Sequence, residues 1–166
     1  GDYDYYTIKY SQELLENVTT CRNLDQENMV YNLQNNVSAN GTCFTVLANN
    51  VTLDCQGHKI NYGATTHGNG ITNYFQNYTT IKNCMINESS TVSSNKYAIN
   101  LTRTFYGTIY NNTIETYDYY TDCIYLNGAY ESGDQHTNIS SNTIRNYYTT
   151  YSADAITLSE SHGNII

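Results

Sequence analysis

The sequence has no proline and no tryptophan, and lysine and arginine together number only 7 among its 166 residues. Aspartate and glutamate number 15, so the formal net charge at pH 7 is −8. So few cations cannot neutralise a row of phosphates, which argues against a nucleic-acid partner, an anionic membrane surface or a polyanionic substrate. No apolar run is long enough to form a transmembrane segment.

Large apolar residues are also scarce, because valine, isoleucine, leucine and phenylalanine total 32. A composition this poor in them is typical of disordered chains, but their regular placement argues for an ordered fold. Asparagine (24), threonine (23) and tyrosine (19) are abundant. Threonine and tyrosine favour strands and asparagine favours corners, so the composition fits one β domain with a thin core.

A six-residue phrase with isoleucine at both ends recurs as I-K-N-C-M-I (81–86), I-Y-N-N-T-I (109–114) and I-S-S-N-T-I (139–144). We expect both isoleucines to point inward, from the end of one strand and the start of the next. The residue two places before the second isoleucine is Cys84, Asn112 or Asn142. Asparagine tolerates the left-handed backbone conformation, so we predict that this residue makes the corner and stacks its amide on the next copy.

A second short strand recurs around Ile71, Ile99, Ile124 and Ile156, at intervals of roughly 25 to 32 residues, which is typical of a solenoid. No repeat carries a helical apolar stripe or the leucine-rich phrase L-x-x-L-x-L. Short strands joined by asparagine corners instead predict stacked parallel strands, about 4.8 Å apart. The predicted fold is therefore all-β: a right-handed parallel β-helix of about five turns.

The two ends of the chain look different from the repeats. We assign residues 1–42 to an N-terminal strand and cap, with a strand at Tyr5–Tyr10 and one or two helical turns at Ser11–Asn17, and residues 43–166 to the β-helix. The start at Gly1 indicates either a removed leader or an excised region. The last turn carries no polar cap, so either the natural protein continues or another copy covers that face.

Nine asparagines stand in N-x-S/T sequons, the acceptor motif for N-glycans in secreted proteins. A chain this rich in asparagine and threonine also produces sequons by chance, so compositional coincidence remains the alternative. The candidate glycosylation sites are Asn17, Asn36, Asn40, Asn50, Asn77, Asn87, Asn100, Asn111 and Asn138.

Five cysteines without a C-x-x-C pair, and far from any histidine at finger spacing, argue against a zinc site, and we predict no metal and no cofactor. Disulfides fit a secreted chain better. Among the possible pairings we favour Cys21 with Cys43, and Cys55 with Cys84. The second pair is favoured because L-D-C and K-N-C end phrases of the same type on successive turns, where stacked strands lie within disulfide reach. Cys123 is left over, either buried or available to a neighbouring subunit.

The stretch G-T-C-F-T-V-L-A-N-N-V-T-L-D-C-Q-G-H-K-I (41–60), followed by G-I-T-N (70–73) and T-T-I-K-N-C (79–84), resembles secreted β-helix repeat proteins of the pectate-lyase-like superfamily. Versions with L-D-C and K-N-C are similar to archaeal surface proteins. The resemblance covers roughly residues 21–166. It implies the fold more strongly than the function, since the superfamily includes lyases, hydrolases, epimerases, adhesins and surface-layer components.

A lyase-type site, which the resemblance implies, needs acidic residues to hold calcium and a basic residue to take a proton. The weak catalytic candidates are Asp122, Asp154 and Arg145, with Glu131, Asp134 and Arg103 as further members. No family catalytic phrase surrounds any of them, and the structural alternative is that Asp122 and Asp154 bond backbone amides at corners. His58 and His162 have the same structural interpretation.

Two tyrosine groups, Tyr117 with Tyr119 and Tyr120, and Tyr147 with Tyr148 and Tyr151, fit a sugar-stacking platform, aromatic ladders or a subunit contact. We expect a non-enzymatic extracellular structural glycoprotein that assembles with copies of itself into a filament, sheath or surface layer. The alternatives are a carbohydrate-active enzyme, lyase or hydrolase, a sugar-binding module, or a fragment of a large adhesin. The expected subunit contact comprises Tyr5, Tyr6, Ile8, Ile156, Ile165 and Ile166.

Overall fold

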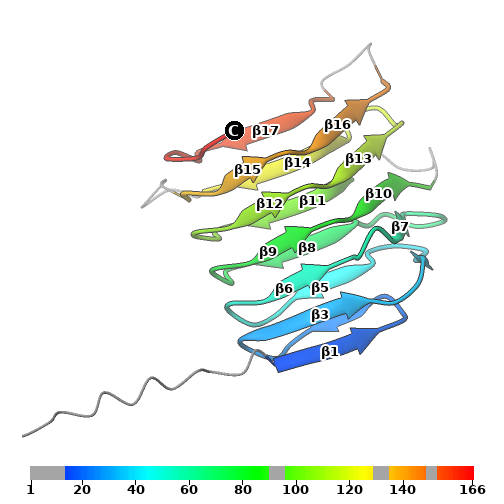
Figure 1. Cartoon of the computed structure of the whole chain (residues 1–166). Helices are drawn as coiled ribbons and strands as arrows, with labels where there is room; N and C mark the ends of the chain where they lie inside the picture. Colours follow the sequence, from blue (N-terminus) through cyan, green and yellow to red (C-terminus); the bar gives the residue numbers. More distant parts are fainter. Residues whose placement is uncertain (1–13, 90–95, 129–134, 149–152) are drawn as a thin grey trace, which may run out of the picture.

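The chain folds into a stack of short parallel strands, as the sequence predicts (Figure 1). The computed structural model describes residues 14–89, 96–128, 135–148 and 153–166. Every strand pair within these residues is parallel, and the strands form three sheets. The all-β parallel β-helix is therefore confirmed, with between five and six turns.

The three sheets run along the length of the stack, and each takes one strand from successive turns. Sheet A contains β1 (Leu14–Val18), β3 (Met29–Leu33), β6 (Thr52–Asp54), β9 (Thr80–Lys82), β12 (Thr108–Tyr110) and β15 (Asn138–Ser140). Sheet B contains β2 (Arg22–Leu24), β5 (Phe44–Val46), β8 (Ile71–Tyr74), β11 (Tyr97–Thr102), β14 (Asp122–Asn127) and β17 (Ile156–Ser159). Sheet C contains β4 (Val37–Ser38), β7 (Lys59–Tyr62), β10 (Met85–Glu88), β13 (Thr113–Thr116) and β16 (Thr143–Asn146).

The core consists of columns of isoleucine that run along the stack. In sheet A, Ile109 pairs with Ile81 below it and Ile139 above it. These are the first isoleucines of the corner phrases, and the second isoleucines form the matching column in sheet C. The isoleucines of the second short strand form the column in sheet B. Because side chains alternate between the faces of a strand, this register places apolar side chains in the interior, from one in β9 to three in β3.

The left-handed corner residue lies one position earlier than predicted. Positive φ angles occur at Asn83 (56°), Asn111 (54°) and Ser141 (58°), and not at Cys84, Asn112 or Asn142. The residue in the left-handed conformation faces outward, so the following side chain turns into the interior. Cys84 and Asn112 are accordingly buried.

The N-terminal part of the described chain is a strand, which corrects the predicted helical turns at Ser11–Asn17. Residues Leu14–Val18 form β1 and pair in register with β3 over their whole length. This ladder satisfies the backbone of β1 and outweighs the local helix signal. Strands β1 to β4 belong to the same three sheets, so the stack begins well before residue 43. The predicted strand at Tyr5–Tyr10 lies outside the described residues.

Both predicted disulfides are present, Cys21–Cys43 and Cys55–Cys84, with Cα–Cα distances of 4.6 and 4.7 Å. These distances are close to the spacing between neighbouring strands. Each bridge therefore links one turn of the stack to the next at equivalent places. Cross-links of this kind restrict the unfolded chain more than the folded one.

The core columns predict a clear contrast between two leucine substitutions. Leu53 in β6 is 1% exposed, whereas Leu47, just after β5, is 50% exposed. We expect Leu53→Ala to lower the free energy of unfolding by about 2–5 kcal/mol because it leaves a cavity between turns. Leu47→Ala should change it by less than about 0.5 kcal/mol. Urea unfolding followed by circular dichroism measures both, and equal effects would contradict the assignment of these faces.

Candidate functional site

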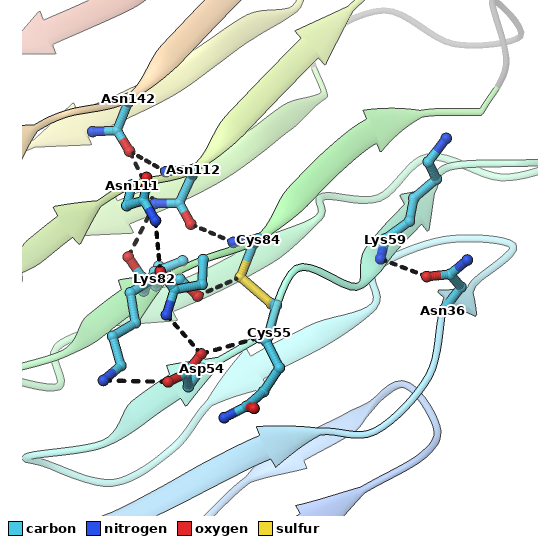
Figure 2. The surroundings of a disulfide bond; sticks show 12 residues. Asn36, Asp54, Cys55, Lys59, Lys82, Cys84, Asn111, Asn112 and Asn142 are labelled. Carbon is cyan, nitrogen blue, oxygen red and sulfur yellow. Dashed lines mark hydrogen bonds and ion pairs between the residues drawn. A yellow bond between two sulfur atoms is a disulfide. The ribbon is translucent and has the colours of Figure 1, made fainter.

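A groove of about 470 Å³ lies on the corner between sheets A and C. The corner around it contains a disulfide and two columns of polar side chains, drawn in Figure 2. One column points into the stack and the other points outward. The groove is lined by Asp54, Gln56, Gly57, Asn83, Cys84, Met85, Asn111 and Thr113.

The inward column contains the Cys55–Cys84 disulfide, followed by Asn112 and Asn142 on the next two turns (Figure 2). The Oδ1 atom of Asn112 accepts a hydrogen bond from the Cys84 N–H at 2.9 Å. The Oδ1 atom of Asn142 accepts from the backbone N–H of Asn112 at 2.8 Å and from its Nδ2 at 3.0 Å. Each asparagine also donates to a carbonyl of the turn below, to Ile81 and Ile109 respectively. The predicted stacking of corner amides is therefore confirmed for this pair.

The outward column contains Asp54, Asn83 and Asn111, one from each of three turns. Nδ2 of Asn83 donates to Oδ1 of Asp54 at 2.9 Å, and Nδ2 of Asn111 donates to Oδ1 of Asn83 at 2.8 Å. Lys82 forms an ion pair with Asp54, with Nζ 3.3 Å from Oδ2. The wall of the groove is thus a row of amides that ends on one paired carboxylate.

Two opposing effects set the pKa of Asp54. Burial raises it, while the hydrogen bonds from Asn83 and from the Gln56 N–H, together with Lys82, lower it. The net result is a pKa below the ordinary value, so the carboxylate is ionised at neutral pH. A carboxylate held by hydrogen bonds in this way is a poor proton donor. It can accept hydrogen bonds from hydroxyl groups, but it is unsuited to general acid catalysis.

The sequence-predicted catalytic residues lie away from this groove. The Oδ1 atom of Asp122 accepts a hydrogen bond from the Asp154 N–H at 2.8 Å, so the two aspartates meet across neighbouring turns. This contact agrees with the alternative that these aspartates bond backbone amides at corners and are not catalytic. Arg145 instead forms an exposed ion pair with Glu115, with Nη1 and Oε1 3.1 Å apart. Glu131 and Asp134 lie outside the described residues.

Two more residues weighed as functional have structural contacts. The guanidinium of Arg103 lies over the ring of Phe75, 5.4 Å from its centroid. The backbone N–H of His58 donates to the Cys55 carbonyl at 2.7 Å and closes a turn in which Gln56 and Gly57 both have positive φ. Within the described residues, no group of three histidine, cysteine or acidic side chains is placed to hold a metal ion.

Aromatic side chains form ladders on the outside of the stack. Tyr117 stacks on Tyr147 with ring centroids 4.9 Å apart, and Tyr97 stacks on Tyr125 at 4.5 Å. The Tyr117–Tyr147 stack agrees with the ladder alternative for these two tyrosine groups. Sequence reasoning missed the Tyr97–Tyr125 stack and a third ladder, Tyr78, Tyr106 and His136, although the last three recur at one position of successive turns and share a positive φ. Tyr151 lies outside the described residues.

The nine sequon asparagines differ in exposure. Asn100 in β11 is only 5% exposed and its Oδ1 accepts a hydrogen bond from Thr102, so it is a poor glycan acceptor. Asn77 and Asn87 are half-buried. The exposed members are Asn17, Asn36, Asn40, Asn50, Asn111 and Asn138.

Cys123 is buried in β14, which favours a place in the core over a bond to a neighbouring subunit. Its Sγ lies 3.2 Å from Oγ1 of Thr116. Burial raises the pKa of the thiol to about 11, so little thiolate forms near neutral pH. Cys123 is therefore a core side chain and not an available partner for another subunit.

The C-terminal end of the stack exposes apolar side chains. Ile165 and Ile166 are 67% and 68% exposed. Together with Ile144 and Ile156 they line a hollow of about 390 Å³ at this end, as the predicted interface requires. The other predicted interface residues, Tyr5, Tyr6 and Ile8, lie outside the described residues.

Comparison with known proteins identifies no family. No protein-family model matches the chain, and no curated protein or solved structure shows significant similarity to it. In the part of the chain that the structure describes, no helix has the length and apolarity to span a membrane.

The pKa of Asp54 predicts a pH dependence of stability. Because this pKa is lower in the folded chain than in the unfolded one, ionised Asp54 stabilises the fold above the unfolded value. That stability is lost as the pH falls below about 4 and through the folded value. We expect Asp54→Asn to lose less stability than the parent chain between neutral and acidic pH, measured by urea unfolding. The exposed Asp25→Asn is the control, and identical pH profiles for all three chains would contradict the assignment.

Proposed function

We propose that this chain is an extracellular structural glycoprotein whose copies join head to tail through the ends of the β-helix. The observation that carries the proposal is the apolar C-terminal face formed by Ile144, Ile156, Ile165 and Ile166. The adjoining strands β16 and β17 are the last members of their sheets among the described residues, whereas Ile165 continues sheet A by one parallel bridge to Asn138 in β15. The outer edges of β16 and β17, together with the exposed isoleucines, favour a partner that continues the sheets.

A second copy fits this face because it presents the same sheets at its other end. There, β1 begins sheet A, and its first two residues, Leu14 and Leu15, are exposed. Parallel strands from one copy could extend the ladders of the next in the same direction. The contact joins two different surfaces, so it propagates into a filament unless it closes into a ring.

Two other features support the extracellular part of the proposal. The two disulfides indicate an oxidising compartment. Six sequon asparagines are exposed, as glycan acceptors must be. We propose accordingly that the chain is a secreted β-helix protein of the pectate-lyase-like superfamily, similar to archaeal surface proteins.

The rival function is a carbohydrate-active or sugar-binding protein, favoured by the amide-lined groove between sheets A and C. Two observations favour a non-enzymatic function over this rival. The pKa of Asp54 is low, and Asp122 accepts a hydrogen bond from the backbone of Asp154. Reducing-end and unsaturated-product assays on acidic and neutral polysaccharides, with and without calcium, test for it. A fragment of a large adhesin would instead bury the C-terminal face against further residues of its own chain.

The proposed contact predicts that charge at the C-terminal face prevents assembly. We expect the Ile165→Asp, Ile166→Asp double variant to sediment as a monomer where the parent chain forms polymers, because carboxylates would be buried in the junction. Leu47→Asp introduces a charge at an exposed apolar site on the side of the stack and should assemble normally. Analytical ultracentrifugation and electron microscopy of the disulfide-bonded chain distinguish the outcomes. A parent chain that stays monomeric at all concentrations would overturn the proposal.

A further inference from the structure

Three charged side chains lie in the interior at the corner between sheets C and B. Glu88 is the last residue of β10, Lys96 directly precedes β11, and Asp118 lies between β13 and β14. Their side chains are 0%, 0% and 2% exposed, respectively. The strands β10 and β13 are neighbours, as are β11 and β14, so the three residues come from two successive turns.

The lysine lies against both carboxyl groups. Its Nζ is 2.6 Å from Oε1 of Glu88 and 3.8 Å from Oδ2 of Asp118. Two acids and one base cannot neutralise each other completely if all three are charged, and an unpaired charge in a protein interior is strongly unfavourable. The site therefore places one amine beside two carboxyl groups in the protein interior.

The two acids have different surroundings. Oε2 of Glu88 accepts hydrogen bonds from the backbone N–H groups of Tyr117 and Asp118, at 2.8 and 3.0 Å. Oδ1 of Asp118 accepts from the Tyr119 N–H at 2.8 Å, but its buried Oδ2 has no hydrogen-bond partner among the described residues. Oε2 of Glu88 is thus held by two backbone donors and Oε1 by the lysine, whereas Oδ2 of Asp118 has only the longer contact with the lysine.

We propose that Lys96 and Asp118 form an intramolecular amide bond, with Glu88 as the catalytic proton carrier. This cross-link is independent of the proposed assembly. It would join the start of β11 to the corner before β14, which lies one turn further along the stack. The two disulfides join earlier pairs of turns, so the amide would join a pair of turns that they do not link.

The reaction needs no oxidant and no further reactant. Oε1 of Glu88 takes a proton from the Lys96 ammonium, and the neutral Nζ attacks Cγ of Asp118, forming the N–C bond. The Tyr119 N–H donates to Oδ1 as negative charge develops there, in the manner of an oxyanion hole. Glu88 carries two protons in turn from Nζ to Oδ2, after which the bond from Cγ to Oδ2 breaks and Oδ2 leaves as water. The Lys96 ammonium and the Asp118 carboxylate thus give one amide and one water. Glu88 ends as a carboxylate and accepts the amide N–H.

The neighbouring backbone makes room for the lysine. Gly63 has a φ of +65°, and a Cβ atom there would lie 3.0 Å from Cδ of Lys96. The aromatic ring of Tyr62 is buried beside it in β7, in register with Glu88. This packing confines the lysine side chain next to both acids, and confinement of reacting groups is a large part of catalysis.

Mass spectrometry of the full chain, made without glycans, folded with its disulfides and then reduced, tests the proposal. We expect the intact mass to be lower than the sequence mass by one water. A tryptic digest should lack cleavage at Lys96 and contain a branched peptide joining Lys96 to Asp118. Full sequence mass in a chain that unfolds cooperatively would overturn the proposal, as would a branch from Lys96 to Glu88.

Single substitutions test the roles of Lys96 and Glu88 in forming the cross-link. Lys96→Met and Glu88→Gln should each have the full sequence mass of the variant, with Glu88→Gln retaining Lys96 and Asp118 unlinked. Lys82→Met is the matched control because Lys82 also pairs with an aspartate, Asp54, but lies near the surface. It should still lose one water. If Glu88→Gln formed the cross-link as completely as the parent chain, the catalytic role of Glu88 would be wrong.

Discussion

In-register stacking of parallel turns is the constraint on which the rest of this structure depends. Each inward side chain lies on its counterpart one turn away, at about the strand spacing of 4.8 Å. A position therefore interacts mainly with the equivalent position of the neighbouring turns, so the groups at these positions must either resemble or complement each other. Isoleucine satisfies this condition in the core, and asparagine satisfies it at the corner because an amide both donates and accepts.

The same constraint explains why different chemistries occupy one column. Along the corner between sheets A and C, a disulfide joins two turns and an asparagine pair joins the next two. Outside, the tyrosine ladders use ring stacking at the same repeat distance. Stability in such a stack is a sum of contacts between neighbouring turns, so the end turns have unsatisfied faces and are suited to assembly. Links between turns, covalent or not, oppose the fraying that this arrangement allows.

The repeat made the fold and both disulfides predictable, because isoleucine and cysteine positions recur with the turns. The corner conformation was predicted one residue late, since Asn111 and Asn112 are both asparagine and the pattern alone cannot separate the outward from the inward one. The strand at Leu14–Val18 was taken for helix because its pairing with β3 is not visible in local sequence. Lys96, Glu88 and Asp118 were missed for a related reason: they lie beside the uneven loops and form no repeating phrase.

A designed cross-link tests the register most directly. Tyr110 and Ser140 are directly opposite in β12 and β15, on the outer face of the stack. We predict that Tyr110→Cys with Ser140→Cys forms a new disulfide, whereas Tyr110→Cys with Asn138→Cys, displaced along the same strands, does not. After alkylation in denaturant without reduction, the first chain should carry a single modification, at Cys123, and the second should carry three. A bond in the displaced pair, or none in the opposed pair, would contradict the in-register stack.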